Sequence, residues 1–243
     1  VNPSGHTTDT YLYDLTQAPT WKHSGSTGNH WYNAKDLVKQ LARLDNTFNG
    51  VVSFVDYVEG IYMGYKFYET AAEEGLIDYS ATVQYPFGYG LSYTTFAQEI
   101  TDLQRNGDNV TVTVKVTNTG DVAGKDAVEL YYTPPYTNGG IEKASVNLID
   151  FEKTEMLQPG ASQTVTFTVA LEDMASYDSE CIKTENGGYI LEAGEYTMSV
   201  RSDAHTVLDS KSFNLDSDVD YSVNGRSSDK QTAVNQFSDM ASD

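Results

Sequence analysis

The sequence predicts a mainly β protein, with a sandwich of two antiparallel sheets in its second half. Every even-numbered position from 110 to 116 is valine, and each odd-numbered position from 111 to 117 is threonine or lysine. A period of two residues is that of a half-buried antiparallel strand. Similar runs follow it, separated by turn residues such as Asn-Thr-Gly-Asp at 118–121 and Gln-Pro-Gly at 158–160. These observations favour short strands joined by tight turns.

Seven strands are predicted in the second half of the chain. Seven short strands in about 120 residues are typical of an immunoglobulin-like sandwich. The chain has one cysteine and no tryptophan on the predicted third strand, so it lacks the disulfide and the buried tryptophan of antibody domains. The fibronectin type III-like variety therefore fits better. The predicted strands are residues 97–103, 110–117, 127–133, 148–154, 164–169, 195–201 and 207–214.

The first 95 residues have a different sequence pattern, with apolar residues at helical spacing and clusters of aromatic residues. Leucine or valine at positions 37, 38, 41 and 44 predicts a core-facing helix over residues 34–44. A short apolar run at 51–54 is suited to a buried strand. Residues 85–93 contain too much glycine and proline for a regular element. We expect them to form a packed aromatic loop that bridges the two parts of the chain.

The sequence pattern changes near Phe96, and the chain becomes polar after residue 216. These two changes divide the chain into three regions. We expect residues 1–95 to belong to one domain and residues 96–216 to form the β-sandwich domain. Residues 217–243 are polar, with few apolar side chains, and cannot supply a core of their own. We therefore expect a linker or flexible tail there.

The charge balance excludes several classes of partner. The chain has 15 basic and 35 acidic residues, which gives a formal net charge of −20. We expect no nucleic acid and no membrane among its partners, because nucleic acid and anionic membranes both require clustered lysine and arginine. One cysteine and four scattered histidines do not suggest a metal site, and we expect neither metal nor cofactor. No apolar run reaches the length of a membrane span, and the compartment stays open between cytoplasmic and secreted.

Several motifs together resemble a known family. Val-Asn-Pro-Ser-Gly stands at 1–5, Tyr-Val-Glu-Gly-Ile-Tyr-Met-Gly-Tyr at 57–65 and Pro-Phe-Gly-Tyr-Gly-Leu-Ser-Tyr-Thr at 86–94. Downstream, Leu-Ile-Asp-Phe-Glu-Lys at 148–153 leads to Leu-Gln-Pro-Gly at 157–160. These segments resemble the late part of glycoside hydrolase family 3, whose best-known members are the β-glucosidases.

The resemblance implies a retaining hydrolase that, when complete, has a (β/α)8-type barrel, an α/β sandwich domain and a fibronectin-like domain. Residues 1–95 would be the C-terminal portion of the α/β sandwich domain, and residues 96–216 the fibronectin type III-like domain. The expected fold class is thus mainly β, an immunoglobulin/fibronectin type III-like β-sandwich preceded by the end of an α/β sandwich domain.

Retention requires a nucleophilic carboxylate and an acid/base carboxylate about 5 to 5.5 Å apart. In the family that the chain resembles, the nucleophilic aspartate lies in the barrel, and the acid/base glutamate lies before the Asn-Pro-Ser-Gly segment. Neither position has a match here, so we expect the isolated chain to be inactive. The expected partners are the remaining catalytic domains of a parent protein and, through the complete enzyme, a β-glucoside or oligosaccharide substrate. Residues 217–243 resemble the connection in members whose barrel follows, although both domain orders stay open.

Two sets of residues are candidates for sugar chemistry. Glu59 lies beside a glycine among aromatic residues, where partial burial could raise its pKa toward that of a general acid. The alternative is a structural glutamate bonded to backbone or to a tyrosine hydroxyl. Pyranose rings stack on aromatic side chains, so four aromatic residues could form a platform for a sugar, or else pack between domains. These four residues are Tyr62, Tyr65, Phe87 and Tyr89.

Two further residues have local interpretations. Tyr196 follows Gly194 at the start of a predicted strand. We expect its hydroxyl to bond a backbone group, as the corner tyrosine of such sandwiches does. Cys181 lies in a polar loop and is predicted to be an incidental free thiol.

Three functions are compatible with the sequence. The chain could be the scaffold and part of the sugar-pocket wall of a β-glucosidase-like hydrolase. It could instead be a non-catalytic fibronectin-like module that binds carbohydrate or protein, or a brace between two larger domains. The motifs before Phe96 favour the first function, because a separate adhesion module has no use for them.

Overall fold

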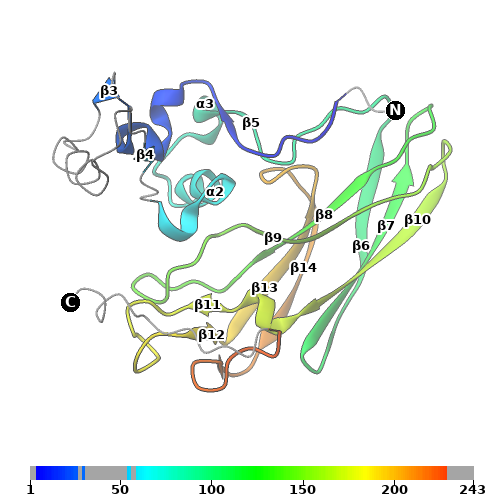
Figure 1. Ribbon diagram of the computed structural model, residues 1–243. Coiled ribbons are helices and arrows are strands. Elements are labelled where there is room, and N and C mark those ends of the chain that lie inside the picture. Colours follow the sequence, from blue (N-terminus) through cyan, green and yellow to red (C-terminus); the bar gives the residue numbers. More distant parts are fainter. Residues whose placement is uncertain (1–3, 27–28, 31–53, 56–58, 229–243) are drawn as a thin grey trace, which may run out of the picture.

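The computed structural model describes residues 4–26, 29–30, 54–55 and 59–228 of the chain. A large β-sandwich carries a smaller part, built from short helices and strands, over one end next to β8 and β9 (Figure 1). The fold class is the one that the sequence predicts, mainly β with a fibronectin-like sandwich. The helix predicted over residues 34–44, and residues 51–53 of the predicted strand, lie outside the described residues.

Two antiparallel sheets make up the sandwich. One has the strand order β10-β7-β6, from β10 (Ser162–Ala170), β7 (Asn109–Asn118) and β6 (Phe96–Asn106). The other has the order β14-β13-β8-β9, and its strands are listed last. All seven predicted strands are confirmed, with ends that differ by a few residues at most. The second sheet comprises β14 (Val207–Leu215), β13 (Gly194–Arg201), β8 (Ala127–Thr133) and β9 (Asn147–Lys153).

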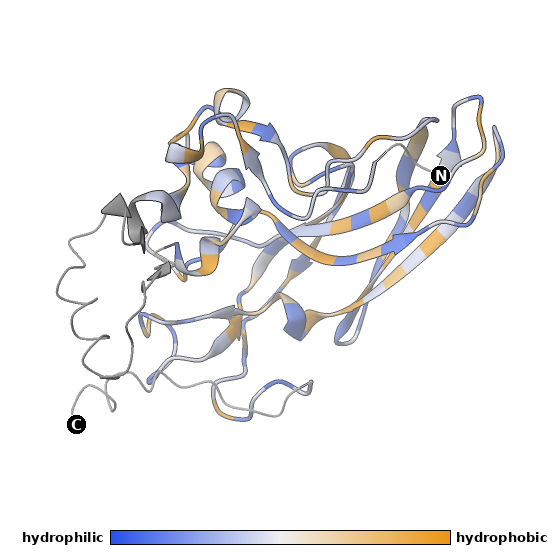
Figure 2. Ribbon diagram, turned by 45° about the horizontal axis from the view of Figure 1, so that its top comes forward, coloured by the Kyte–Doolittle hydropathy of each residue, from blue (hydrophilic) through white to orange (hydrophobic). Residues whose placement is uncertain are grey.

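The core lies between these sheets and follows from the alternation. The four valines at even positions of β7 are fully buried, and Val114 pairs with Val165 of β10. From the opposite sheet, Leu130 and Met198 fill the space, both at 0% exposure. Figure 2 shows the resulting alternation of hydrophobic and hydrophilic residues along the long strands. Each buried aliphatic side chain stabilises the fold by roughly 1.5–3 kcal/mol.

A third, smaller sheet lies beside the sandwich. It has the order β11-β12-β15, from β11 (Ser176–Tyr177), β12 (Tyr189–Leu191) and β15 (Val219–Asp220). It follows a short 3-10 helix, η4 (Leu171–Met174), in which Glu172 is buried.

The sequence predicts a linker or tail over residues 217–243, and the structure describes the first twelve of these residues. Through its last described residue this segment is held against the sandwich, because β15 pairs with β12 and the carboxylate of Glu172 accepts hydrogen bonds from Ser227 and Ser228. The Ser227 amide lies 2.6 Å, the Ser227 hydroxyl 2.8 Å and the Ser228 amide 2.9 Å from the carboxylate oxygens. Polar composition hid this attachment, since it rests on hydrogen bonds rather than on apolar burial. The boundary at 217 stays a prediction.

The smaller part consists of short helices and strands, of which α2 and α3 are described first. Its main helix, α2 (Tyr65–Glu73), begins after Gly64, whose φ of 64° suits glycine. The next helix, α3 (Tyr79–Thr82), is capped by Asp78, which accepts a hydrogen bond from the Ala81 amide. No helix among the described residues is long and apolar enough to cross a membrane. The remaining elements are β1 (Tyr11–Leu12), η1 (Leu15–Gln17), η2 (Pro19–His23), β2 (Ser24–Ser26), β3 (Asn29–His30), β4 (Phe54–Val55), η3 (Gly60–Tyr62) and β5 (Val83–Tyr85).

Candidate functional site at the seam

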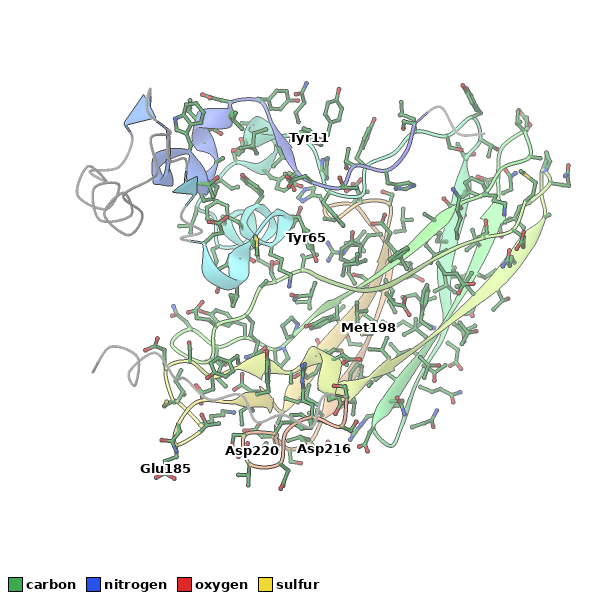
Figure 3. All side chains as sticks on the ribbon, viewed as in Figure 1. Tyr11, Tyr65, Glu185, Met198, Asp216 and Asp220 are labelled. Carbon is green, nitrogen blue, oxygen red and sulfur yellow. The ribbon has the colours of Figure 1, made fainter. Side chains whose placement is uncertain are left out.

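An aromatic cluster joins the smaller part to the sandwich. The ring of Tyr65, at the start of α2, stacks on Phe87 with the centroids 4.8 Å apart and meets Tyr131 of β8 edge-on at 6.1 Å. Its hydroxyl accepts a hydrogen bond from the Leu148 amide of β9 at 2.8 Å. Figure 3 shows Tyr65 between α2 and the sandwich. Burial raises the pKa of Tyr65, so this side chain stays a neutral packing group.

The predicted aromatic loop at 85–93 bridges the two parts, as expected. The carbonyl of Phe87 accepts a hydrogen bond from the Ala204 amide of the sandwich at 2.8 Å, and the Gly88 amide donates to the Thr7 carbonyl at 2.9 Å. Gly88 has a φ of 82°, and a Cβ on it would lie 2.5 Å from a carboxylate oxygen of Glu129. Only glycine lets the loop approach β8 this closely.

Two histidine–glutamate pairs cross the seam. His6 places its Nδ1 2.5 Å from the Gly88 carbonyl and 3.4 Å from Glu129, whose other oxygen accepts a hydrogen bond from Tyr131 at 2.6 Å. The hydrogen bond with Glu129 raises the pKa of His6, and burial acts against it. In the second pair, Nδ1 of His205 lies 2.9 Å from the Glu69 carboxylate of α2. The sequence predicts a role for none of these four residues.

A buried arginine lies between these pairs. The Arg201 side chain donates hydrogen bonds to the Ser199 hydroxyl at 2.9 Å and to the Ala204 carbonyl at 2.8 Å. Its guanidinium lies 5.6 Å from the ring centroid of Tyr131. Burial lowers its pKa, and the carboxylates of Glu69 and nearby residues act in the opposite direction. The seam thus combines a small hydrophobic cluster around Tyr131 with a network of charged groups.

Two cavities open beside the seam, with volumes of about 510 and 450 Å³. Tyr62 of η3 and Glu142 of the β8–β9 loop line both of them, and the Tyr62 hydroxyl donates a hydrogen bond to the Glu142 carboxylate. Glu59 lines the smaller of these cavities. Among the described residues, one of its carboxylate oxygens, Oε2, is buried without a hydrogen-bond partner.

The structure brings together some of the predicted sugar-site residues and separates others. Tyr65 and Phe87 form the stack at the seam, which favours the packing interpretation for these two rings. Tyr62 lies at the cavities, and Tyr89 lies with its ring 5.3 Å from that of Tyr85. A role of any of them in sugar binding stays a prediction. No group of three or more metal-ligating side chains occurs among the described residues.

The two local interpretations can be compared with the structure directly. The Tyr196 hydroxyl donates a hydrogen bond to the Glu192 carbonyl at 3.0 Å, which confirms the corner tyrosine. Cys181 is an exposed free cysteine with a φ of 55°. The contact of Tyr196 spans four residues, which is why it could be predicted from the sequence.

Comparisons with known proteins agree with this architecture. A family model described as the fibronectin type III-like domain matches residues 126–204. The chain is 36% identical over 218 residues to a β-glucosidase of Ruminococcus albus. Its fold resembles β-glucosidase 3B of Thermotoga neapolitana, solved in complex with α-D-glucose, with a TM-score of 0.68 and 28% identity. It also resembles a GH3 β-glucosidase of Bifidobacterium adolescentis, with a TM-score of 0.56 and 32% identity.

The matches cover most of this chain but only a small part of each known protein. The matches take in 89%, 90% and 70% of this chain, but 19%, 26% and 23% of the Ruminococcus, Thermotoga and Bifidobacterium proteins, respectively. The chain therefore spans about a fifth to a quarter of the length of the proteins that it matches.

Proposed function

We propose that this chain, which belongs to glycoside hydrolase family 3, acts within a larger β-glucosidase-like retaining enzyme as a scaffold and as part of the wall of its sugar pocket. Residues 1–95 would contribute the end of the α/β sandwich domain, and residues 96–216 the fibronectin type III-like domain. The observation that carries the proposal is the seam, where Tyr65, Phe87 and Tyr131 pack against one another. A binding module that acts alone has no need of such a joint.

The scaffold role follows from the polarity of the seam. Its histidine–glutamate pairs and aromatic contacts depend on distance and orientation more strongly than apolar burial does. They therefore hold α2 on the sandwich and also fix its orientation there. In a parent enzyme, this would fix the position of whatever catalytic domain packs against the smaller part.

The pocket wall would come from aromatic residues outside the stack of Tyr65 and Phe87. Tyr62 and Tyr89 are half-buried and keep part of their rings open to a ligand. In the complete enzyme, Tyr89→Ala should raise KM for an aryl β-glucoside and leave kcat within about twofold, which is the signature of lost uniform binding. Tyr93→Ala is the control, because Tyr93 is 66% exposed in the same loop.

The isolated chain should not hydrolyse β-glucosides. A retaining mechanism needs a carboxylate pair, and Glu59 alone cannot serve as both nucleophile and proton donor. The test is release of nitrophenol from nitrophenyl β-glucoside by the purified 243-residue chain, with Glu59→Gln beside it. Turnover by the unchanged chain that Glu59→Gln abolishes would make Glu59 catalytic and would end the scaffold proposal.

The second candidate function is a carbohydrate-binding module without catalysis. It is favoured by the cavity that Glu59 lines together with several tyrosine side chains, and it does not exclude the first function.

A further inference from the structure

A third cavity lies within the smaller part, with a volume of about 630 Å³. Its walls come from two segments, residues 8–20 with β1 and η1, and residues 59–68, which lead into and begin α2. None of the described residues that line it belongs to the sandwich. The volume falls within the roughly 300–1,000 Å³ of small-molecule sites, so the cavity is large enough for an organic ligand.

The charged groups that line this cavity are acidic. Among its described lining residues, Asp9 and Glu59 carry carboxylates and none is basic. Oε2 of Glu59 is buried and has no hydrogen-bond partner in the part of the chain that the structure describes. Glu59 also lines the smaller cavity at the seam, where burial lowers the pKa of Lys66 and the Glu59 charge has no effect on it. The carboxylate of Glu59 therefore has no cationic partner among the described residues.

A buried tyrosine opens into the same cavity. Tyr68 of α2 is only 7% exposed and lines the cavity, and its hydroxyl makes no hydrogen bond with the described part of the chain. Burial raises the pKa of Tyr68 to about 12, and the charges of Asp9 and Glu59 add to this rise. The hydroxyl is therefore neutral at ordinary pH, and both carboxylates lie near enough to act on it. Burying a polar group without a partner is costly, so a ligand that satisfies it would bind favourably.

The polar atoms of the cavity favour a ligand that donates hydrogen bonds and carries a positive charge. Oγ1 of Thr10 is a further lining atom that is buried without a partner among the described residues. This hydroxyl, the Tyr68 hydroxyl and the Glu59 carboxylate can all accept hydrogen bonds, and an ammonium group has three donors and no acceptor. An anion would be repelled by both carboxylates, and a neutral ligand would leave their charge unbalanced. The acceptors therefore favour a primary ammonium group.

The walls favour an organic cation over a metal ion. The described residues hold no group of three or more metal-ligating side chains, and a single ion would leave most of the cavity unfilled. The N-terminal end of α2 borders the cavity at Gly64, but its positive charge of about one half is smaller than the charge of two carboxylates. Aromatic rings attract cations to their faces, and aliphatic side chains suit a hydrocarbon chain. The apolar lining residues include Leu12, Leu15, Met63 and Phe67.

We propose that this cavity binds a primary alkylammonium ion, whose ammonium group donates hydrogen bonds to Glu59 and Tyr68 and whose hydrocarbon chain packs on the apolar walls. Thr10 supplies a further acceptor, and the exposed carboxylate of Asp9 adds to the attraction. The site lies away from the sandwich and requires no catalytic domain. It therefore goes beyond the proposed scaffold function, and its failure would leave that function untouched.

The test is a titration of the 243-residue chain with n-butylammonium chloride in about 0.15 M salt, which screens attraction by the net charge of the chain. NMR chemical shifts follow the binding, and we expect saturating shifts at Thr10, Met63 and Tyr68. The matched probe is 1-butanol, which has the same hydrocarbon chain without the charge. It should bind at least about tenfold more weakly, because it lacks the charge-assisted hydrogen bonds.

Three variants test the carboxylates. Glu59→Gln keeps the shape of the side chain and removes its charge, and it should weaken binding of n-butylammonium at least tenfold, about 1.4 kcal/mol. Asp9→Asn should weaken binding by about threefold, because the Asp9 side chain is exposed. The control is Glu99→Gln, which removes an exposed carboxylate of β6 on the sandwich and should leave binding within about twofold.

Four results would overturn the proposal. They are no saturating shift with n-butylammonium, equal affinity for 1-butanol, unchanged affinity in both Glu59→Gln and Asp9→Asn, and saturation of the same residues by calcium chloride at lower concentration. The last result would assign the site to a metal ion. Melting curves show whether each variant is folded, and if Glu59→Gln is not, Asp9→Asn still decides the question.

Discussion

The imidazole of His205 lies flat on the ring of Tyr79, with the centroids 3.6 Å apart and the planes inclined by 6°. His205 belongs to the loop between β13 and β14, and Tyr79 begins α3. The same imidazole reaches Glu69 of α2 through Nδ1. One side chain of the sandwich thus contacts both α2 and α3, which fixes the orientation of these two helices on the sandwich.

Truncation of Tyr65 should weaken the seam. Tyr65→Ala removes a stacked ring and the acceptor for the Leu148 amide, at an expected cost of about 3–5 kcal/mol in the free energy of unfolding. Tyr93→Ala, at a site that is 66% exposed, should cost less than about 0.5 kcal/mol. Urea unfolding of the two variants measures the difference. Equal midpoints would show that the aromatic cluster does not stabilise the chain.

The pair of His6 and Glu129 should make stability depend on pH. The hydrogen bond with Glu129 raises the pKa of His6 in the folded chain, burial opposes it, and the Gly88 carbonyl and Asp126 add to the rise. The contribution is therefore fully present below the unfolded pKa of about 6.5 and is lost as the pH rises through the folded pKa. It should stay below about 1 kcal/mol, because the His6 side chain is 37% exposed.

The measurement for His6 is a comparison of His6→Ala with the unchanged chain in urea at pH 5.5 and at pH 8.5. The destabilisation by His6→Ala should be larger at the lower pH. The acidic net charge of the chain affects both proteins alike and cancels in this difference. A destabilisation that grows with pH would have the opposite sign and would refute the assignment.

Gly88 should tolerate no side chain. Gly88→Ala places a methyl group 2.5 Å from a Glu129 carboxylate oxygen in a backbone with a φ of 82°, so we expect a loss of about 2–4 kcal/mol. Gly107→Ala is a matched control, since Gly107 has a φ of 60° but no atom near its added Cβ. It should lose only about 1 kcal/mol. Thermal melting distinguishes the two, and an equal loss would mean that Gly88 is required for its φ alone.

The segment after β14 should detach when Glu172 is removed. Glu172→Ala takes away the acceptor of the Ser227 and Ser228 amides, so hydrogen exchange of residues 219–228 should accelerate by more than about tenfold while β7 stays protected. Glu195→Ala, at an exposed site of β13, is the control. Slow exchange that persists in Glu172→Ala would show that the pairing of β15 with β12 is sufficient.

The sandwich could be predicted from the sequence because its information is local. Valine at every second position of β7 fixes both the strand and the buried face, and Tyr196 finds its acceptor four residues away. The polar pairs of the seam could not be predicted in this way, although the bridging role of the loop at 85–93 could. His205 and Glu69 are 136 residues apart, and no period or spacing connects them. Polar side chains in loops are compatible with solvent in any sequence, and only the fold shows that these are paired.

The candidate sugar-site residues could be predicted only in part. Tyr65 and Phe87 were predicted to be either sugar contacts or packing residues, and their stack favours packing.

The short strand β15 covers one edge of the small sheet. Figure 3 places Asp220 of this strand at the lower edge of the molecule, near Asp216. Without β15, the backbone amides and carbonyls of β12 would form an open sheet edge, on which a further chain could pair. With it, the sheet ends in a strand of two residues that carries a carboxylate. A strand of two residues with a carboxylate offers little backbone for a further chain to pair with, so β15 protects this edge of the small sheet from edge-to-edge pairing.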